Sequence, residues 1–209
     1  MNKISNVLGL YVIVDPEHTG GRDCADVASS AVSGGAEVIQ LRAKLMSGKT
    51  LYETALAIRE LSRKTGALFI MNDAVDIAIA VGADGVHIGQ DDMPLAAVRR
   101  LVGPDVIIGV STHSVEEAEA AEAGGADYIG FGPMFSTPTK DSGTPKGPAG
   151  LRAIRGEVRI PVVAIGGINA SNAPGVIEAG ADAVAVISAV ISRDDVEEAA
   201  RDIVKAIRM

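Results

Sequence analysis

Four copies of one short pattern limit what this chain can fold into. Each copy has one or two glycines, then Ala-Asp or Ala-Glu, then a short apolar run. The copies are Gly34–Arg42, Gly82–Gly89, Gly124–Gly132 and Gly180–Ile187. The glycine can end a helix in a left-handed conformation at little cost, and the run is typical of a buried strand. The pattern therefore predicts a repeated passage from a helix into a strand.

The spacing of the copies predicts eight strand-helix units. The glycine that precedes alanine recurs at intervals of 47, 43 and 55 residues, and each interval has room for two units. The other four predicted strands are rich in β-branched residues and cover 10–15, 67–72, 106–111 and 161–166. Eight parallel strands can close into a (β/α)8 TIM barrel, here a single domain over 1–209. A doubly wound open sheet is the alternative, and the even repetition disfavours it.

Composition and charge favour a small-molecule ligand. The 209 residues carry a formal net charge of −8, and only 3% are aromatic. This acidic balance argues against general affinity for nucleic acid or an anionic membrane. The first residues carry no secretion signal and no apolar run could span a membrane, so we expect a cytoplasmic protein. Cys24 is expected to be a buried apolar residue of the first helix.

One predicted connection is much longer than the others. Residues 132–147 separate the sixth strand from the next helix, whereas such connections usually have about 2 to 6 residues. Glycine, proline, threonine and lysine make up most of the segment. We expect a lid over the site, with Thr137, Thr139 and Lys140 able to bind an anion.

Polar residues collect where the predicted strands end. In a closed parallel barrel the loops after the carboxyl ends of the strands build the site, so these residues should face one mouth. Gln40, Arg42 and Lys44 alternate at the end of the second strand and should share a face that favours an anion. The other polar strand ends are Asn72, Asp73, Gly89–Asp92, Ser111, Gly166–Gly167 and Ile187–Ser188.

The first site that these residues predict is a metal-diphosphate site. Asp73 and Asp92 lie on adjacent units and can hold Mg²⁺, which usually takes one or two carboxylates and completes its shell with water and phosphate. Arg42, Lys44 and Lys140 can neutralise the remaining phosphate charge. The alternative is that Asp73 and Asp92 only cap the third and fourth helices.

The second predicted site needs no metal. Gly167 and the Ile187-Ser188 turn follow strands seven and eight, which is the usual phosphate pocket of such barrels. A diphosphate on one molecule and a monophosphate on another indicate group transfer rather than isomerisation. His87, inside a strand, is expected to be packed or hydrogen-bonded, and His113 is a candidate ligand contact at the mouth.

Taken together, these motifs resemble the thiamine-phosphate synthase family. The segments that carry the resemblance are Leu10–Asp15, Gln40–Lys44, Asn72-Asp73, Gly85–Asp92, Gly109–His113, Gly130–Pro133, Thr137–Lys140 and Ala164–Ile168. The glycine phrases alone are shared by many phosphate-binding barrels, but the joint set is specific. The resemblance runs from Leu8 to Ile207.

The resemblance implies a transferase that joins hydroxymethylpyrimidine diphosphate to the nitrogen of a thiazole phosphate and releases pyrophosphate, with Mg²⁺ as cofactor. It implies that Asp73 and Asp92 hold the metal, with Asp92 preferred over Asp91. The residues implied for the pyrimidine diphosphate are Gln40, Arg42, Lys44, Asn72, Ser111 and Lys140. Those implied for the thiazole phosphate are Thr137, Thr139, Gly167, Ile187 and Ser188. Catalytic roles fall to Lys44, Arg42, Ser111 and Lys140.

Two other classes of function are compatible with a phosphate-binding barrel. A thiazole tautomerase, an isomerase of related sequence, would use the monophosphate site and a histidine. A non-catalytic phosphate-binding barrel would use either site without turnover. A tautomerase has no diphosphate for Asp73, Asp92, Lys44 and Lys140 to bind, and only the transferase should need Mg²⁺ and both substrates.

Overall fold

The computed structural model describes residues 9–137 and 144–208. The strands are β1 (Leu10–Val14), β2 (Val38–Leu41), β3 (Leu68–Asn72), β4 (Gly85–Ile88), β5 (Ile107–Thr112), β6 (Tyr128–Phe131), β7 (Val162–Ile165) and β8 (Ala183–Val186). The helices are η2 (Pro16–His18), α1 (Cys24–Ser33), α2 (Gly48–Thr65), α3 (Val75–Val81), α4 (Leu95–Val102), α5 (Val115–Ala123), α6 (Gly147–Glu157), α7 (Ala173–Glu178), α8 (Ser188–Ile191) and α9 (Val196–Ile207). Strands and helices alternate along the chain, as the repeated pattern predicts.

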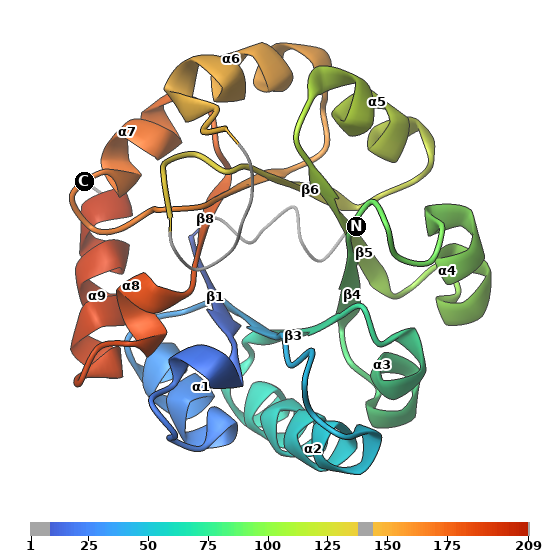
Figure 1. The fold of residues 1–209 in the computed structure, drawn as a ribbon, viewed down its shortest axis with the longest axis vertical. Coiled ribbons are helices and arrows are strands. Elements are labelled where there is room, and N and C mark those ends of the chain that lie inside the picture. Colours follow the sequence, from blue (N-terminus) through green and yellow to red (C-terminus); the bar gives the residue numbers. More distant parts are fainter. Residues whose placement is uncertain (1–8, 138–143, 209) are drawn as a thin grey trace.

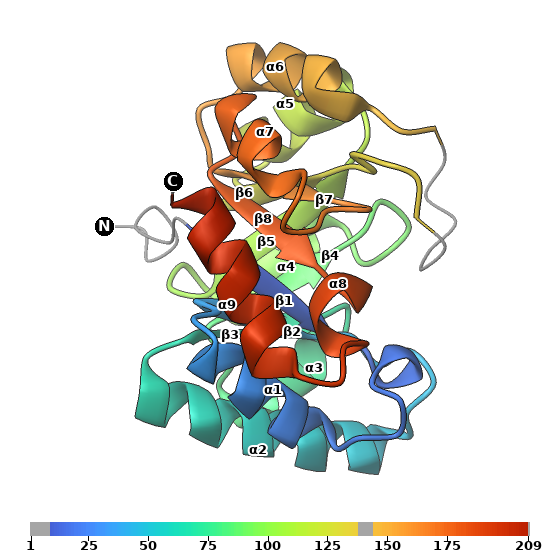
Figure 2. The same cartoon turned by 90° about the vertical axis from the view of Figure 1, so that its left-hand side faces the viewer.

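The eight strands form one closed parallel barrel in sequence order. The last strand pairs with the first, with Leu10 opposite Val184 and Val12 opposite Val186. Figure 1 looks along the barrel and shows the helices as an outer ring, and Figure 2 shows the same arrangement from the side. The predicted (β/α)8 barrel is confirmed, and the open sheet is excluded because closure leaves no edge strand.

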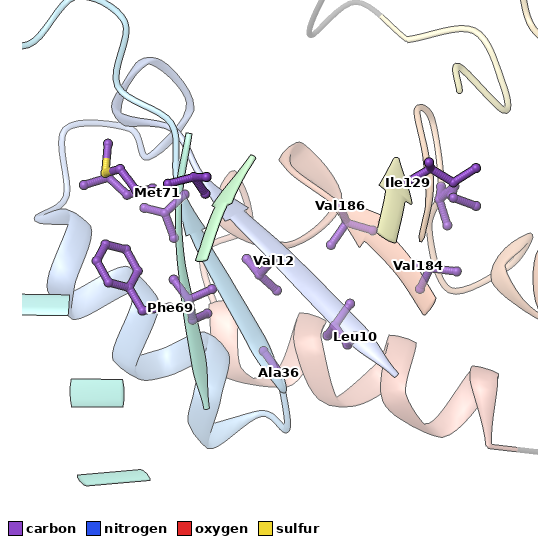
Figure 3. Packing of buried hydrophobic residues seen from close by; sticks show 14 of the residues in the cluster. Leu10, Val12, Ala36, Phe69, Met71, Ile129, Val184 and Val186 are labelled. Atoms are coloured by element: carbon purple, nitrogen blue, oxygen red, sulfur yellow. The ribbon is translucent and has the colours of Figure 1, made fainter. Parts of the chain in front are cut away.

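Two apolar layers stabilise the barrel, because successive strand residues point to opposite faces. Residues such as Val12 and Phe69 point outwards and pack against the helices (Figure 3). Residues such as Tyr11 and Ile70 point inwards and form the second cluster, inside the barrel.

Cys24 is buried in the outer layer, as expected, and burial raises the pKa of its thiol to about 11. Within the described residues, no helix has the length and apolar character needed to cross a bilayer.

The repeated pattern has a structural reason at the amino-terminal end of the barrel. Its four glycines, Gly35, Gly82, Gly125 and Gly180, have φ angles of 103°, 67°, 86° and 108°. This left-handed conformation is strained for residues with a side chain, so glycine is required where each helix turns back into a strand. The pattern therefore repeats because the same turn is built four times.

The acidic residue of the pattern stabilises the turn from helix to strand in the last three copies. Its carboxylate accepts the N–H of the previous strand and pairs with an arginine of the helix before that strand. The sets are Asp84 with Phe69 and Arg59, Asp127 with Ile108 and Arg99, and Asp182 with Val162 and Arg155. Each carboxylate thus joins the start of its own strand to the previous strand and to the helix before that strand, at the end opposite the strands' carboxyl ends.

We predict that Gly109→Ala destabilises the protein by about 3 kcal/mol, the upper range for overpacking of a core. Gly109 lies on β5, and a Cβ there would meet the Tyr128 ring at 2.0 Å. Tyr128 is fully buried inside the barrel and is hydrogen-bonded to Tyr11 and His87, so displacing its ring would break these bonds. Urea unfolding should therefore show a clearly lower midpoint.

Gly156→Ala is the matched control for Gly109→Ala. Gly156 lies near the end of α6, and a Cβ there would have no atom within 4 Å. Alanine favours a helix over glycine by about 0.5 to 1 kcal/mol, so this variant should be slightly more stable than the parent. Equal unfolding midpoints for the two variants would contradict the account of β5.

Candidate active site

Two adjoining cavities open at the carboxyl ends of the strands. The inner cavity, of about 580 Å³, has the polar lining residues Tyr11, Gln40, Arg42, Asn72, His87, Ser111 and Tyr128. The rim cavity, of about 690 Å³, has the polar lining residues Ser111, Thr112, His113, Thr137 and Ser188, with Gly166 and Gly167 beside them. Ser111 and Ile187 line both cavities. Ligands held in the two cavities would therefore be in contact.

A chain of hydrogen bonds crosses the floor of the inner cavity. Its links are Gln40 Nε2 to Tyr11 Oη (2.6 Å), Tyr11 Oη to Tyr128 Oη (3.0 Å), Tyr128 Oη to His87 Nδ1 (2.9 Å) and His87 Nε2 to Ser111 Oγ (2.9 Å). The five residues come from five different strands. The chain fixes Gln40 and Ser111, both predicted site residues, at its two ends.

The two tyrosines of this series of hydrogen bonds, Tyr11 and Tyr128, are neutral at any physiological pH. Burial raises the pKa of Tyr11, which its hydrogen bonds to Tyr128 and Gln40 only partly oppose. Burial likewise raises the pKa of Tyr128, and the charge of Tyr11 and the hydrogen bond with it raise it further. The inner cavity therefore has hydrogen-bonding hydroxyls in its wall and no phenolate charge.

Arg42 is held in place by a residue that the sequence analysis missed. β2 ends at Leu41, and the next residue, Arg42, donates its backbone N–H to Val14 at 2.9 Å. The Arg42 side chain lines the inner cavity and forms an ion pair with Asp15, whose side chain is only 1% exposed. The buried carboxylate orients the guanidinium group and balances part of its charge.

Lys44 lies beyond the strand and belongs to a different cluster. Its Nζ is 3.2 Å from Oδ2 of Asp73, and about half of the side chain is exposed. The predicted shared face of Gln40, Arg42 and Lys44 is therefore divided. Gln40 is buried in the barrel, Arg42 pairs with Asp15, and Lys44 reaches over to the end of β3.

The carboxyl groups of Asp73 and Asp92 are brought together at the ends of β3 and β4. Burial raises the pKa of Asp73, and the hydrogen bond and charge of Asp92 add to this effect while Lys44 opposes it. Burial also acts to raise the pKa of Asp92, but the Gly89 N–H, Asp73 and Lys44 outweigh it, so that pKa is lowered. The two acids share one proton or one cation more easily than they ionise side by side.

Neither of these acids caps a helix among the described residues. The residues that precede α3 and α4 are Ala74 and Pro94, and neither helix start has a side-chain cap. Asp92 instead accepts the Gly89 N–H at 2.7 Å, and Asp73 has a left-handed φ of 59°. A non-glycine residue with such a φ is uncommon and typical of functional sites. The capping interpretation is therefore wrong.

The donor set fits Mg²⁺. Two carboxylates from adjacent loops lie close together, and burial, followed by the nearness of Asp92, raises the pKa of Asp73. Mg²⁺ typically takes one or two carboxylates and leaves its other positions to water and phosphate. No group of three or more His, Cys, Asp or Glu side chains suited to a metal occurs in the described parts of the chain. A zinc-type site is thus not found there.

The rim cavity has the features expected of a phosphate pocket. Gly166 and Gly167 have φ angles of 103° and 65°, and Cβ atoms there would meet Pro133 at 2.8 Å and the Ser136 carbonyl oxygen at 2.7 Å. Ser188 begins α8, directly after β8. The predicted residues Gly167, Ile187 and Ser188 therefore all line this one cavity.

The remaining predicted residues divide between described and undescribed positions. Thr137 and His113 line the rim cavity, and Asn72 and Ser111 line the inner cavity. Thr139 and Lys140 lie outside the described residues, as does the middle of the connection 132–147, so their roles and the lid stay predictions. His87 is buried and hydrogen-bonded, as expected, and Tyr11, Tyr128 and Asp15 are the site residues that sequence reasoning missed.

Comparison with known proteins is decisive at this point. The model of the family "Thiamine monophosphate synthase" matches residues 10–190. The chain belongs to the thiamine monophosphate synthase family. A thiamine-phosphate synthase of Moorella thermoacetica is 54% identical over 193 residues, covering 92% of each chain. One of Chloroflexus aurantiacus is 52% identical, covering 93% of this chain and 90% of the relative.

A solved structure supports the same assignment. The thiamine phosphate pyrophosphorylase of Pyrococcus furiosus superposes with a TM-score of 0.88 at 42% identity, and 96% of each chain is covered. The family resemblance stated from the motifs is therefore confirmed. So is the expectation of an enzyme of this family, whose named members are synthases of thiamine phosphate.

Proposed function

We propose that this chain is a Mg²⁺-dependent thiamine-phosphate synthase. In the proposed reaction, hydroxymethylpyrimidine diphosphate is joined to the nitrogen of a thiazole phosphate, and pyrophosphate is released. The names of the relatives support the class of reaction. The observation that carries the proposal is the pair of adjoining cavities with Ser111 and Ile187 in both walls, because a transferase must bring two ligands into contact.

The pyrimidine diphosphate is assigned to the inner cavity and the acidic cluster beside it. Gln40, held by Tyr11, is an amide that can hydrogen-bond the edge of a polar heterocycle, and Ser111 is a hydroxyl on the opposite side. Arg42 and Lys44 supply positive charge for the diphosphate. Lys140 is proposed to add a third cation.

Asp73 and Asp92 are proposed to hold Mg²⁺. The chemistry that the bound ion supplies is neutralisation of the negative charge that develops on the departing pyrophosphate. Lys44 contacts Asp73 at 3.2 Å and is therefore positioned to bind the same diphosphate. Asp92 is oriented by the Gly89 N–H, which its Oδ2 accepts at 2.7 Å.

The thiazole phosphate is assigned to the rim cavity. Gly167 and Ser188 would bind its phosphate, with Thr137 and Thr139 from the long connection. The reacting nitrogen belongs to the substrate and is already nucleophilic, so the protein needs no serine or cysteine nucleophile. Its task is to orient the two rings and to keep water from the reacting carbon. The apolar side chains Ile165, Ala185 and Ile187, shared by both cavities, support this exclusion of water.

The test is to mix the purified protein with both phosphorylated heterocycles and Mg²⁺, and to measure pyrophosphate and coupled product. We expect one pyrophosphate for each coupled product, and loss of both when a chelator removes the metal. A parallel reaction should contain the thiazole phosphate alone. Rearrangement of that single compound without metal would support a tautomerase and contradict the proposal, as would coupling that persists in the chelator.

A further inference from the structure

Arg22, in the loop between β1 and α1, is bonded to the turn that follows α8. Its Nη2 donates to the Ile191 carbonyl at 2.6 Å, and its Nη1 donates to the carbonyls of Arg193 at 2.8 Å and Asp194 at 3.4 Å. Its Nε donates to the Thr19 carbonyl in its own loop at 2.7 Å. One side chain therefore joins two loops that are about 170 residues apart in sequence.

α8 depends on such contacts because it is only a single turn of four residues. A helix of that length has no stability of its own, and its last carbonyls lack partners within the helix. Arg22 binds the carbonyl of its final residue, Ile191, and a cation at the carboxyl end of a helix is favourable. A second bond runs from Ser192 Oγ to the His18 carbonyl at 2.9 Å. The β1–α1 loop therefore holds α8 in place.

The same α8 carries part of the rim cavity. Ser188 and Ala189 line that cavity, whereas Val190 and Ile191 are buried in the core. Figures 1 and 2 both show α8 close to α1 and the connection between β1 and α1. Because α8 is a single turn, a shift at its carboxyl end would also move Ser188 at its other end.

The β1–α1 loop is also linked to the inner cavity, through the lining residue Arg42. It begins at Asp15, the buried partner of Arg42, and Thr19 ties its two halves together through bonds from Oγ1 to the carbonyls of Pro16 and Arg22. Thr19 is 1% exposed, so these two bonds lie in the buried centre of the loop. One compact loop thus contacts Arg42 on one side and α8 on the other.

We propose that Arg22 is a positioning residue for the thiazole-phosphate pocket: it fixes α8 so that Ser188 meets the phosphate. This inference rests on the proposed function. Arg22 itself touches no ligand, because all its bonds go to carbonyl oxygens of the loops. Its loss should therefore affect one substrate much more than the other.

The experiment compares Arg22→Gln and Arg22→Lys with Arg99→Gln. Arg99 is a matched control because it also bonds three carbonyls, those of Gly103, Val106 and Gly125, but at the amino-terminal end of the barrel. For Arg22→Gln we expect kcat/KM for the thiazole phosphate to fall about 10- to 100-fold, because a small displacement of a bound substrate lowers the rate by about this factor. KM for the pyrimidine diphosphate should change less than about 3-fold, and saturating thiazole phosphate should restore most of kcat. Arg22→Lys should be intermediate.

Hydrogen exchange supplies a readout that does not depend on activity. The N–H groups of Val190 and Ile191 bond to the Ile187 carbonyl, and they should exchange faster in Arg22→Gln but not in Arg99→Gln. Equal loss for both substrates, or unchanged exchange in α8, would overturn the role of Arg22 while leaving the proposed function intact. No coupling by the parent enzyme would overturn the proposed function itself, and the inference with it.

Discussion

Asp73→Asn is expected to lower kcat/KM for the pyrimidine diphosphate at least about 100-fold, the usual cost of removing one group that stabilises transition-state charge. Asp73 contacts both Lys44 and Asp92 and is one of the two carboxylates proposed to hold Mg²⁺. Removing its charge also raises the Mg²⁺ concentration needed for half-maximal activity. Turnover measured over a range of Mg²⁺ concentrations checks both effects.

The fold should survive this substitution, for two reasons. Asparagine accepts the left-handed φ of 59° at position 73 better than most residues do. The change also relieves the repulsion between two neighbouring carboxylates, and the ion pair that it removes, with Lys44, is partly exposed and therefore contributes little to stability. Thermal unfolding should therefore shift little, and parallel losses of stability and activity would contradict a role in ligand binding.

Asp91→Asn is the matched control for Asp73→Asn. Asp91 is exposed and adjacent to Asp92, so the variant removes the same charge from the same mouth without touching the acidic pair. We expect its turnover and Mg²⁺ dependence to stay within about 3-fold of the parent, because an exposed charge is well screened. A large effect would mean that Asp91, and not Asp92, is the second ligand.

The fold could be predicted from the sequence because its main determinant is local. The turn from helix to strand needs a left-handed glycine and an acid that binds the previous strand, as at Gly125 and Asp127. Both requirements leave a visible mark within a few neighbouring residues. The order of the strands then follows, since consecutive parallel strands joined by helices tend to lie side by side.

The contact of Asp73 with Asp92 could be predicted for the same reason, as β3 and β4 are neighbours in the barrel. The hydrogen bond between Tyr11 and Tyr128 could not, because it joins residues 117 positions apart across the barrel. Each tyrosine occupies a position in its strand where an aliphatic residue would fit the pattern equally well. The pairing of Arg42 with Asp15 was hidden similarly, since a strand-end acid looks the same whether it binds a ligand or an arginine.

Ser188→Asp separates the two proposed sites most sharply. Ser188 begins α8 and lines the rim cavity, so an aspartate there would put a negative charge beside the proposed phosphate. Two unit charges about 4 Å apart repel by about 4 kcal/mol near a protein surface. We therefore expect KM for the thiazole phosphate to rise about 100-fold or more, which steady-state kinetics with each substrate varied in turn will measure.

The same substitution should not weaken the fold, because a negative charge at the start of a helix is favourable by about 0.3 to 1 kcal/mol. KM for the pyrimidine diphosphate should stay within about 3-fold, since the acidic cluster at β3 and β4 is a separate site. Ser188→Ala is the control: it removes the hydroxyl without adding charge and should raise KM for the thiazole phosphate much less. If Ser188→Asp raised both KM values alike, the division into two phosphate sites would be wrong, and a single shared anion site would have to replace it.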